Sequence, residues 1–297
     1  MQIVDPHIHL WDLSTHRYPW LDKPGVNFLG DYASIARTHL PADFLAEAAP
    51  IEVVKVVHID AGHDPSDPLS ETIWLQGLAD DPQGPGLPQA IVAAANLSQP
   101  GVEALLAAHA ERPNMRGIRQ ILNVHPDPVY DYVTRHYMDD PVWRRNFRLL
   151  AKYGLSFDLQ IYPSQMKAAA ELARENPQTS FILNHAGMFV DRDRVDAYVL
   201  WRDGMRLLAG CDNVSVKISG LGMLDHAWTV ESLRPYALES IDAFGPHRSM
   251  FASNFPVDRL FSSYEALWNA YAAIVGGASA AERDALFRTN AERIYRI

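Results

Sequence analysis

The sequence has very little cysteine, with Cys211 as the one thiol among 297 residues. A single cysteine excludes an intramolecular disulfide and a cysteine-rich metal knuckle. It also suits a reducing compartment, where disulfides are rare. The first residues, Met1-Gln2-Ile3-Val4-Asp5, lack the basic and apolar regions of a secretory signal peptide. We therefore expect a cytoplasmic protein.

Positive charge is also scarce, because 26 Lys and Arg residues stand against 36 Asp and Glu residues and the formal net charge is −10. Binding a phosphate backbone needs a basic patch, so nucleic acid is not an expected partner. No apolar run approaches the roughly 18 residues that span a bilayer, and a membrane is not expected either. With nucleic acid and a membrane not expected, we expect a small molecule as the partner.

Short apolar runs recur along the chain with helical stretches between them, such as residues 164–175 and 194–208. Continuous runs such as Val53-Val54-Lys55-Val56-Val57 are typical of parallel strands covered on both faces. Eight such units predict a (β/α)8 TIM barrel that forms a single domain over residues 1–297, with a doubly wound open sheet as the alternative. The expected strands are residues 2–7, 53–60, 89–95, 115–122, 155–161, 180–185, 214–219 and 249–254.

Polar side chains gather at the ends of these expected strands, where barrel enzymes carry their active sites. Packing alone does not explain them, because burying an unpaired polar group costs several kcal/mol. Two residues apart on one strand, side chains share a face. The strand-end residues are His7, His9, His58, Asp60, Arg119, Asp158, Gln160, Asn184, His185, Lys217, Ser219, Ser253 and Asn254.

The pair His7 and His9 is the sharpest local signal. Two imidazoles at strand spacing can share one metal ion or one oxyanion. Both roles stay open at this point, as does a metal-free site. The long irregular region after this strand, residues 9–41, is expected to help build the site, because loops at this end of a barrel usually do.

Several segments in order along the chain together resemble the amidohydrolase-2 branch of the amidohydrolase superfamily. Within that branch the chain looks most like TIM-barrel lactone hydrolases, whose characterised members open sugar-acid lactones, pyrone-dicarboxylate rings or muconolactone rings. The resemblance covers essentially the whole chain. The segments are Asp5-Pro6-His7-Ile8-His9-Leu10-Trp11-Asp12, Tyr18-Pro19-Trp20-Leu21, Gly117-Ile118-Arg119, Asn184-His185-Ala186-Gly187, Lys217-Ile218-Ser219-Gly220-Leu221 and Ser253-Asn254-Phe255-Pro256-Val257-Asp258.

The resemblance implies a role for each matching residue. His7, His9 and His185 would polarise the scissile carbonyl, directly or through a divalent ion such as zinc or manganese that they would ligate. Arg119 and Lys217 would hold a carboxylate or the developing oxyanion. His58, Asp158, Gln160 and Trp11 complete the expected substrate contacts. The substrate would be anionic or polyhydroxylated, and pairing as a homodimer is an expectation from barrels of this kind.

One position departs from the pattern of these hydrolases. Their eighth strand usually ends Ser-Asp-Trp-Pro with the aspartate activating water, whereas this chain has Asn254, and an amide cannot act as a general base. Asn184 likewise replaces a common aspartate. We predict Asp258 as the replacement base, with Asp158 and Asp60 as alternatives. A purely structural role for Asp258, in which it pairs with Arg259 or caps a turn, stays open.

Structural roles also stay open for other candidates. Lys217 would then be a buried partner of a carboxylate, His58 a hydrogen-bonded core residue, and Trp11 part of the packing inside a long loop. For the whole protein, the sequence predicts a hydrolase that opens a small lactone or cyclic ester of a sugar acid or dicarboxylate. The alternatives are a metal-dependent decarboxylase of the same branch and a barrel that binds a small molecule without catalysis.

Overall fold

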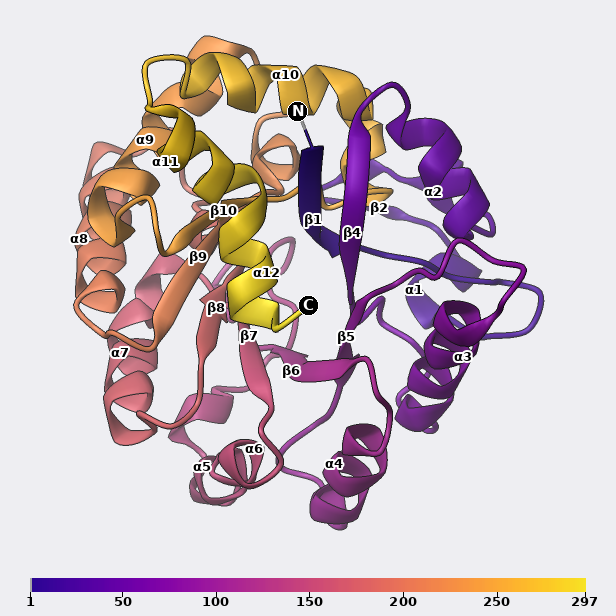
Figure 1. Ribbon diagram of the computed structural model, residues 1–297. Helices are drawn as coiled ribbons and strands as arrows, with labels where there is room; N and C mark the ends of the chain where they lie inside the picture. The colour runs from indigo at the N-terminus through magenta and orange to yellow at the C-terminus, as the bar shows by residue number, and fades with distance from the viewer. Residues whose placement is uncertain (1) are drawn as a thin grey trace.

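Eight parallel strands form one sheet in a computed structural model that describes residues 2–297. Neighbours in the sheet follow the chain order, so it curls into a barrel (Figure 1). The end of β1 meets the segment that follows β10, where the amide of Asn254 donates to the carbonyl of His7 and that of His9 to the carbonyl of Phe255, both at 2.8 Å. The strands are β1 (Gln2–Ile8), β4 (Glu52–Ile59), β5 (Ala90–Ala94), β6 (Met115–Ile121), β7 (Ser156–Gln160), β8 (Phe181–Leu183), β9 (Val214–Ile218) and β10 (Ser249–Phe251). The predicted TIM barrel is confirmed.

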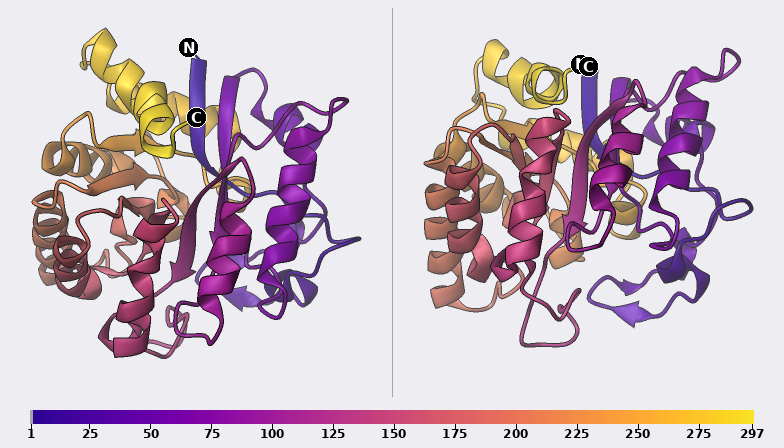
Figure 2. Two further views of the ribbon diagram at one scale, coloured as in Figure 1. Left: turned by 60° about the horizontal axis from the view of Figure 1, so that its bottom comes forward. Right: turned by 90° about the horizontal axis from the view of Figure 1, so that it is seen from below.

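Helices surround the sheet as an outer ring (Figures 1 and 2). Expected helices 164–175 and 194–208 are found as α7 and α8. The start of α7 is shifted because Pro163–Gln165 forms a 3-10 turn, and α8 begins one residue later than expected, at Val195. No helix among residues 2–297 has both the length and the apolar character needed to cross a membrane. The helices are α1 (Pro19–Asp22), α2 (Pro41–Ala48), α3 (Pro68–Asp80), α4 (Val102–Ala110), α5 (Pro141–Phe147), α6 (Leu149–Lys152), α7 (Met166–Glu175), α8 (Val195–Ala209), α9 (Val230–Phe244), α10 (Tyr264–Ile274), α11 (Ala280–Asp284) and α12 (Asn290–Tyr295).

Side chains alternate between the two faces of each strand, and this separates two apolar layers. On β4, Val57 and Ile59 belong to a cluster that also contains Val92 of β5 and Met250 of β10 and fills the inside of the barrel. Residues of the opposite parity, such as Phe157 on β7, pack outward against the helices in a larger cluster. Because side chains alternate across a strand, a polar residue's position along its strand decides whether it faces the barrel axis.

The C-terminal helix α12 lies across the end of the barrel where the strands begin (Figures 1 and 2). Asn290 fixes its start by donating to the carbonyls of Pro246 and Ser249 at 2.7 and 2.8 Å. Ala291 and Tyr295 pack into the inner apolar cluster. The helix therefore closes one end of the barrel, and the polar residues at the strand ends lie at the other end.

The long segment between β1 and α2 covers the end where the strands finish. It contains the short pair β2 (Val26–Asn27) and β3 (Gly30–Asp31), which is antiparallel. Its aromatic residues form a separate cluster with residues of later loops, such as Tyr162 and Met223. Trp11, Tyr18, Phe28 and Tyr32 are all buried in it. This segment therefore covers the end of the barrel at which the polar strand-end residues lie.

Candidate active site

His7 is held at the end of β1 by its neighbour Asp5. The Asp5 carboxylate accepts hydrogen bonds from the amides of His7 and Ser253, at 3.2 and 3.0 Å, and from the Tyr264 hydroxyl at 2.9 Å. Asp5 thereby ties β1 to the end of β10, and burial raises its pKa to about 6. Both ring nitrogens of His7 are buried without a hydrogen-bond partner among the described residues. Such orphaned groups are rare and point to an absent ligand or water.

His9 has one ring nitrogen fixed and one directed at Asn254. Its Nδ1 lies 2.7 Å from the carbonyl of Ile59, and only a protonated Nδ1 can bond to a carbonyl. Burial, with the nearby positive charge of Arg119, lowers the pKa of His9 well below its usual value. The neutral ring therefore carries a lone pair on Nε2, which lies 3.3 Å from Asn254 Oδ1.

His185 is positioned by the turn that follows β8 and by its neighbour on β9. His185 and Ala186 have φ of 54° and 49°, a left-handed conformation that is uncommon for residues with a side chain. The His185 Nδ1 contacts Ser219 Oγ at 3.0 Å. Gly220 leaves room for the ring, because a Cβ there would lie 2.5 Å from His185 Nδ1.

Of the three predicted histidines, His9 and His185 each lie next to His7. The ring centroid of His7 lies 5.0 Å from that of His9 and 4.6 Å from that of His185. Burial is the main cause that lowers the pKa of His7 and of His185 well below the usual range. Neutral imidazoles therefore face one another around His7.

Asp258 lies behind Asn254 and contacts it directly. Asn254 adopts φ of 63° and donates from Nδ2 to Asp258 Oδ2 at 2.5 Å. Burial raises the pKa of Asp258 to about 7. Arg259 does not pair with Asp258 but with Glu47. The structure thus brings the predicted replacement base to the site, with one amide between it and His9.

Arg119 faces the same end of the barrel from β6. Its Nη1 donates to Gln160 Oε1 at 3.1 Å, its Nε lies 3.4 Å from Asp60 Oδ2, and its Nη2 donates to the Asp60 carbonyl. Burial raises the pKa of Asp60, and the charge of Arg119 opposes this. Arg119 is 6% exposed, so a rigid, nearly dry guanidinium stands beside the histidines.

Lys217 and Asp158 form a fully buried ion pair inside the barrel. Lys217 Nζ lies 2.5 Å from Asp158 Oδ1, which also accepts from Tyr295 at 2.9 Å and from Asn184 at 3.0 Å. Burial lowers the pKa of Lys217 to about 8. The sequence left open whether Lys217 binds substrate or pairs with a carboxylate, and the contacts show the pair.

Two further candidates, His58 and Trp11, lie outside the group of site residues described so far. His58 accepts from the Leu10 amide at 3.1 Å through Nδ1, and its Nε2 lies 3.7 Å from Glu71, away from the inner strand face of Val57 and Ile59. Trp11 is completely buried in the aromatic cluster of the covering loop and donates to the Arg37 carbonyl at 2.6 Å. Both fit the structural role that the sequence left open.

Sequence reasoning did not identify three residues that shape the site. Asp5 holds the end of β1 around His7, and its place in the Asp5-Pro6-His7 segment was the available signal. Gly220 makes room for His185. Tyr295 reaches Asp158 from the last helix, and no local pattern shows that a C-terminal helix enters the barrel.

A divalent ion does not fit the donors as they are placed. Three imidazoles are ligands that zinc accepts. Within residues 2–297, however, no three His, Cys, Asp or Glu side chains surround one point as a metal ion requires. His9 Nε2 is directed at Asn254, and Asn184 donates to Asp158, so each of these two positions offers the histidines an amide in place of a carboxylate.

Comparison with known proteins identifies the family. The family model described as Amidohydrolase matches residues 4–297. The uncharacterized protein y4mH of Sinorhizobium fredii is 50% identical over 299 residues, covering 99% of this chain and 98% of that protein. An L-fucono-1,5-lactonase of Burkholderia multivorans is 30% identical over 312 residues, covering 99% and 96%.

A solved structure supports the same assignment. The crystal structure of an amidohydrolase from Burkholderia multivorans with bound zinc has a TM-score of 0.83 and 26% identity over the whole of both chains. Fold and sequence agree along the full length of the chain. The protein therefore belongs to the amidohydrolase family.

Proposed function

We propose that this protein is a hydrolase that opens a small lactone of a sugar acid or dicarboxylate. The observation that carries the proposal is His7, whose two buried ring nitrogens lack partners and face the rings of His9 and His185. The sequence similarity to an L-fucono-1,5-lactonase, at 30% identity over nearly the whole chain, supports a cyclic ester as the substrate.

Arg119 would anchor the substrate. Its planar guanidinium suits a carboxylate or a pair of hydroxyls, and the low exposure of the site strengthens such contacts. Gln160 and Asp60 hold the guanidinium in one orientation. The ester carbonyl would then lie against His7 and His185, whose ring N–H groups donate to the oxygen as negative charge develops on it.

His9 would take the proton of the attacking water. Its Nδ1 proton is held by Ile59, so Nε2 is the basic atom. Asn254 Oδ1 can stabilise the protonated ring only while the amide keeps its oxygen toward His9. Ionised Asp258 enforces that orientation by accepting from Asn254 Nδ2. Protonated Asp258 favours the reversed amide, whose NH2 group would block the His9 lone pair.

The proposed reaction balances with one water. The water oxygen forms a bond to the ester carbon while its proton passes to His9. The bond between that carbon and the ring oxygen then breaks. His9 returns the proton to the ring oxygen, which leaves as a hydroxyl on the opened acid. Asp258 acts through Asn254, so it is a positioning residue in this scheme.

The test is hydrolysis of a panel of sugar-acid and dicarboxylate lactones, followed with a pH indicator. We expect turnover of at least one lactone by the wild type and its loss in His7→Ala and His185→Ala. Arg202→Gln, on the outer helix α8, serves as the control variant. Silence across the panel with a folded protein would reject the proposal and favour the alternative of a barrel that binds without catalysis.

A further inference from the structure

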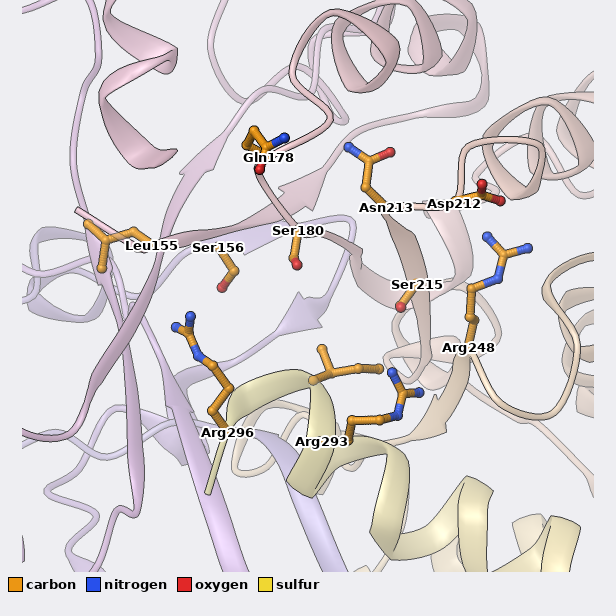
Figure 3. Close-up of a pocket in the computed structure, with 12 residues that line it drawn as sticks. Leu155, Ser156, Gln178, Ser180, Asp212, Asn213, Ser215, Arg248, Arg293 and Arg296 are labelled. Atoms are coloured by element: carbon orange, nitrogen blue, oxygen red, sulfur yellow. The ribbon is translucent and has the colours of Figure 1, made fainter. Parts of the chain in front are cut away.

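A second cavity lies at the opposite end of the barrel, where the strands begin. It has a volume of about 270 Å³. Ser156 of β7, Ser180 just before β8 and Ser215 of β9 lie along one side of it (Figure 3). The Ser180 and Ser215 hydroxyls make no hydrogen bond within the described part of the chain, whereas Ser156 donates to the Arg116 carbonyl at 3.2 Å. Two hydroxyls therefore remain available to a ligand.

Three arginines line the same cavity. Arg248 and Arg293 lie on one side of it and Arg296 on the other (Figure 3). None of the three forms an ion pair with a carboxylate of residues 2–297, although Asp212 is also at the cavity edge. This is unusual in a protein with a net charge of −10, where acidic partners are abundant.

The arginines hydrogen-bond to neutral groups, which leave their charge uncompensated. Arg248 donates to the carbonyls of Ala209, Cys211 and Val214 at 2.8 to 3.1 Å. Arg293 donates to the His247 carbonyl at 2.5 Å and to Asn290 Oδ1 at 3.3 Å. Arg296 donates to the Arg116 carbonyl at 3.2 Å. Burial and the charge of Arg296 lower the pKa of the nearby Arg116. Like charges thus gather here. Arg293 and Arg296 each keep two guanidinium nitrogens without an acceptor among the described residues, and Arg248 keeps one.

We propose that this cavity binds the phosphate group of a small ligand. Arginine donors on two sides with hydroxyls between them suit a tetrahedral anion with several oxygens better than a planar carboxylate. The volume is just below the range of about 300–1,000 Å³ that holds drug-sized molecules, so the ligand is a small metabolite or free phosphate. This site is independent of the proposed hydrolytic function.

A bound phosphate would also fix the C-terminal helix. Arg293 lies on α12 and Arg296 follows it directly, while Arg248 precedes β10, so an anion between them bridges the helix and the sheet. A ligand that binds only the folded state raises the midpoint of thermal unfolding. We therefore expect phosphate to stabilise the protein.

The test is isothermal titration calorimetry with inorganic phosphate and with glycerol 3-phosphate, at an ionic strength matched with sodium chloride. Thermal unfolding is measured in the same buffers. We expect saturable binding, and at least tenfold weaker binding in Arg293→Gln/Arg296→Gln. The control Arg202→Gln/Arg206→Gln removes the same charge from the exposed side of α8 and should bind within twofold of wild type.

Ser180→Glu is the second variant, because it places a carboxylate at the cavity on an exposed residue with little risk to folding. It should abolish binding. Tighter binding of glycerol 3-phosphate than of phosphate supports a phosphomonoester as the ligand, and equal binding supports free phosphate. The proposal is overturned if no heat exceeds the sodium chloride control, or if the double variant and Ser180→Glu bind like the wild type.

Discussion

Single residues in β1 and at the ends of β8, β9 and β10 determine how the histidine rings are placed. His185 and Asn254 both have positive φ, a conformation that costs free energy and is often found at functional sites. Gly220 and Asp5 act indirectly: one leaves space for a ring, and the other ties together the backbone around His7. These residues shape the site without needing to touch a substrate.

Gly220→Ala should abolish most of the activity. The new Cβ would lie 2.5 Å from His185 Nδ1, so the ring must move away from His7. Gly154→Ala is the matched control, because Gly154 also has positive φ, at 65°, but nothing lies within 4 Å of its added Cβ. Both variants should lose about 1 kcal/mol of stability from the backbone. Comparable activity in the two variants would refute the role of Gly220.

Asp258 makes stability depend on pH. Folding raises its pKa from 3.8 to about 7, so the folded state favours the protonated acid. Its contribution to the free energy of unfolding is complete below about pH 4 and is lost as pH rises to about 7. The shift corresponds to on the order of 4 kcal/mol. Urea unfolding of Asp258→Asn should show a stability gain over wild type at pH 8 that shrinks at pH 5, and a pH-independent difference would be contrary to this prediction.

At the scale of elements, the last helix and strand β7 meet inside the barrel. Tyr295, which ends α12, reaches Asp158, and Asp158 holds Lys217 of β9. A buried ion pair needs such extra hydrogen bonds to offset the cost of removing two charges from water. Helix α12 therefore contributes to the interior that supports the site as well as to the floor of the barrel.

Tyr295→Phe should destabilise the protein by about 1–3 kcal/mol, because it removes a hydrogen bond to a buried carboxylate. Tyr198→Phe on α8 is the control, since its hydroxyl makes no hydrogen bond within residues 2–297, and it should change stability by less than about 0.5 kcal/mol. The measurement is the free energy of unfolding in urea. Equal stability of the two variants would mean that the α12 contact contributes little.

The sequence was sufficient to predict the strands and helices of the barrel, but only some of the side-chain contacts between them. Eight apolar runs between helical stretches were sufficient to predict the barrel, because buried parallel strands have few alternatives. Positions at strand ends were sufficient to place His7, His9, His185 and Arg119 at one end. The pairing of Lys217 with Asp158, and the part of Tyr295, depend on contacts between distant segments that no local pattern encodes.

For the whole molecule, net charge opposes an anionic substrate while Arg119 attracts it locally. A charge of −10 repels anions at long range, and salt screens this repulsion beyond about 10 Å at 0.1 M. The covering loops bury the site, so the guanidinium beside the histidines is much less screened.

Raising sodium chloride from 20 to 200 mM should therefore increase kcat/KM for an anionic lactone by about two- to fivefold. A neutral lactone of similar size should show no comparable change, and it controls for effects of salt on the protein. Steady-state assays on both substrates at constant pH make the comparison. A decrease for the anionic lactone would show that attraction by the site, and not the net charge, governs its capture.

In the proposed reaction, activity depends on ionised Asp258, which acts through Asn254 on His9, and the pH profile of kcat/KM measures this dependence. With the lactone that turns over fastest, wild-type kcat/KM should rise with pH through an apparent pKa near 7, because ionised Asp258 keeps the Asn254 oxygen toward His9. Asp258→Asn should lose that limb of the profile and about 10²-fold or more of its activity. An unchanged profile in a folded, active Asp258→Asn would rule out this role of Asp258.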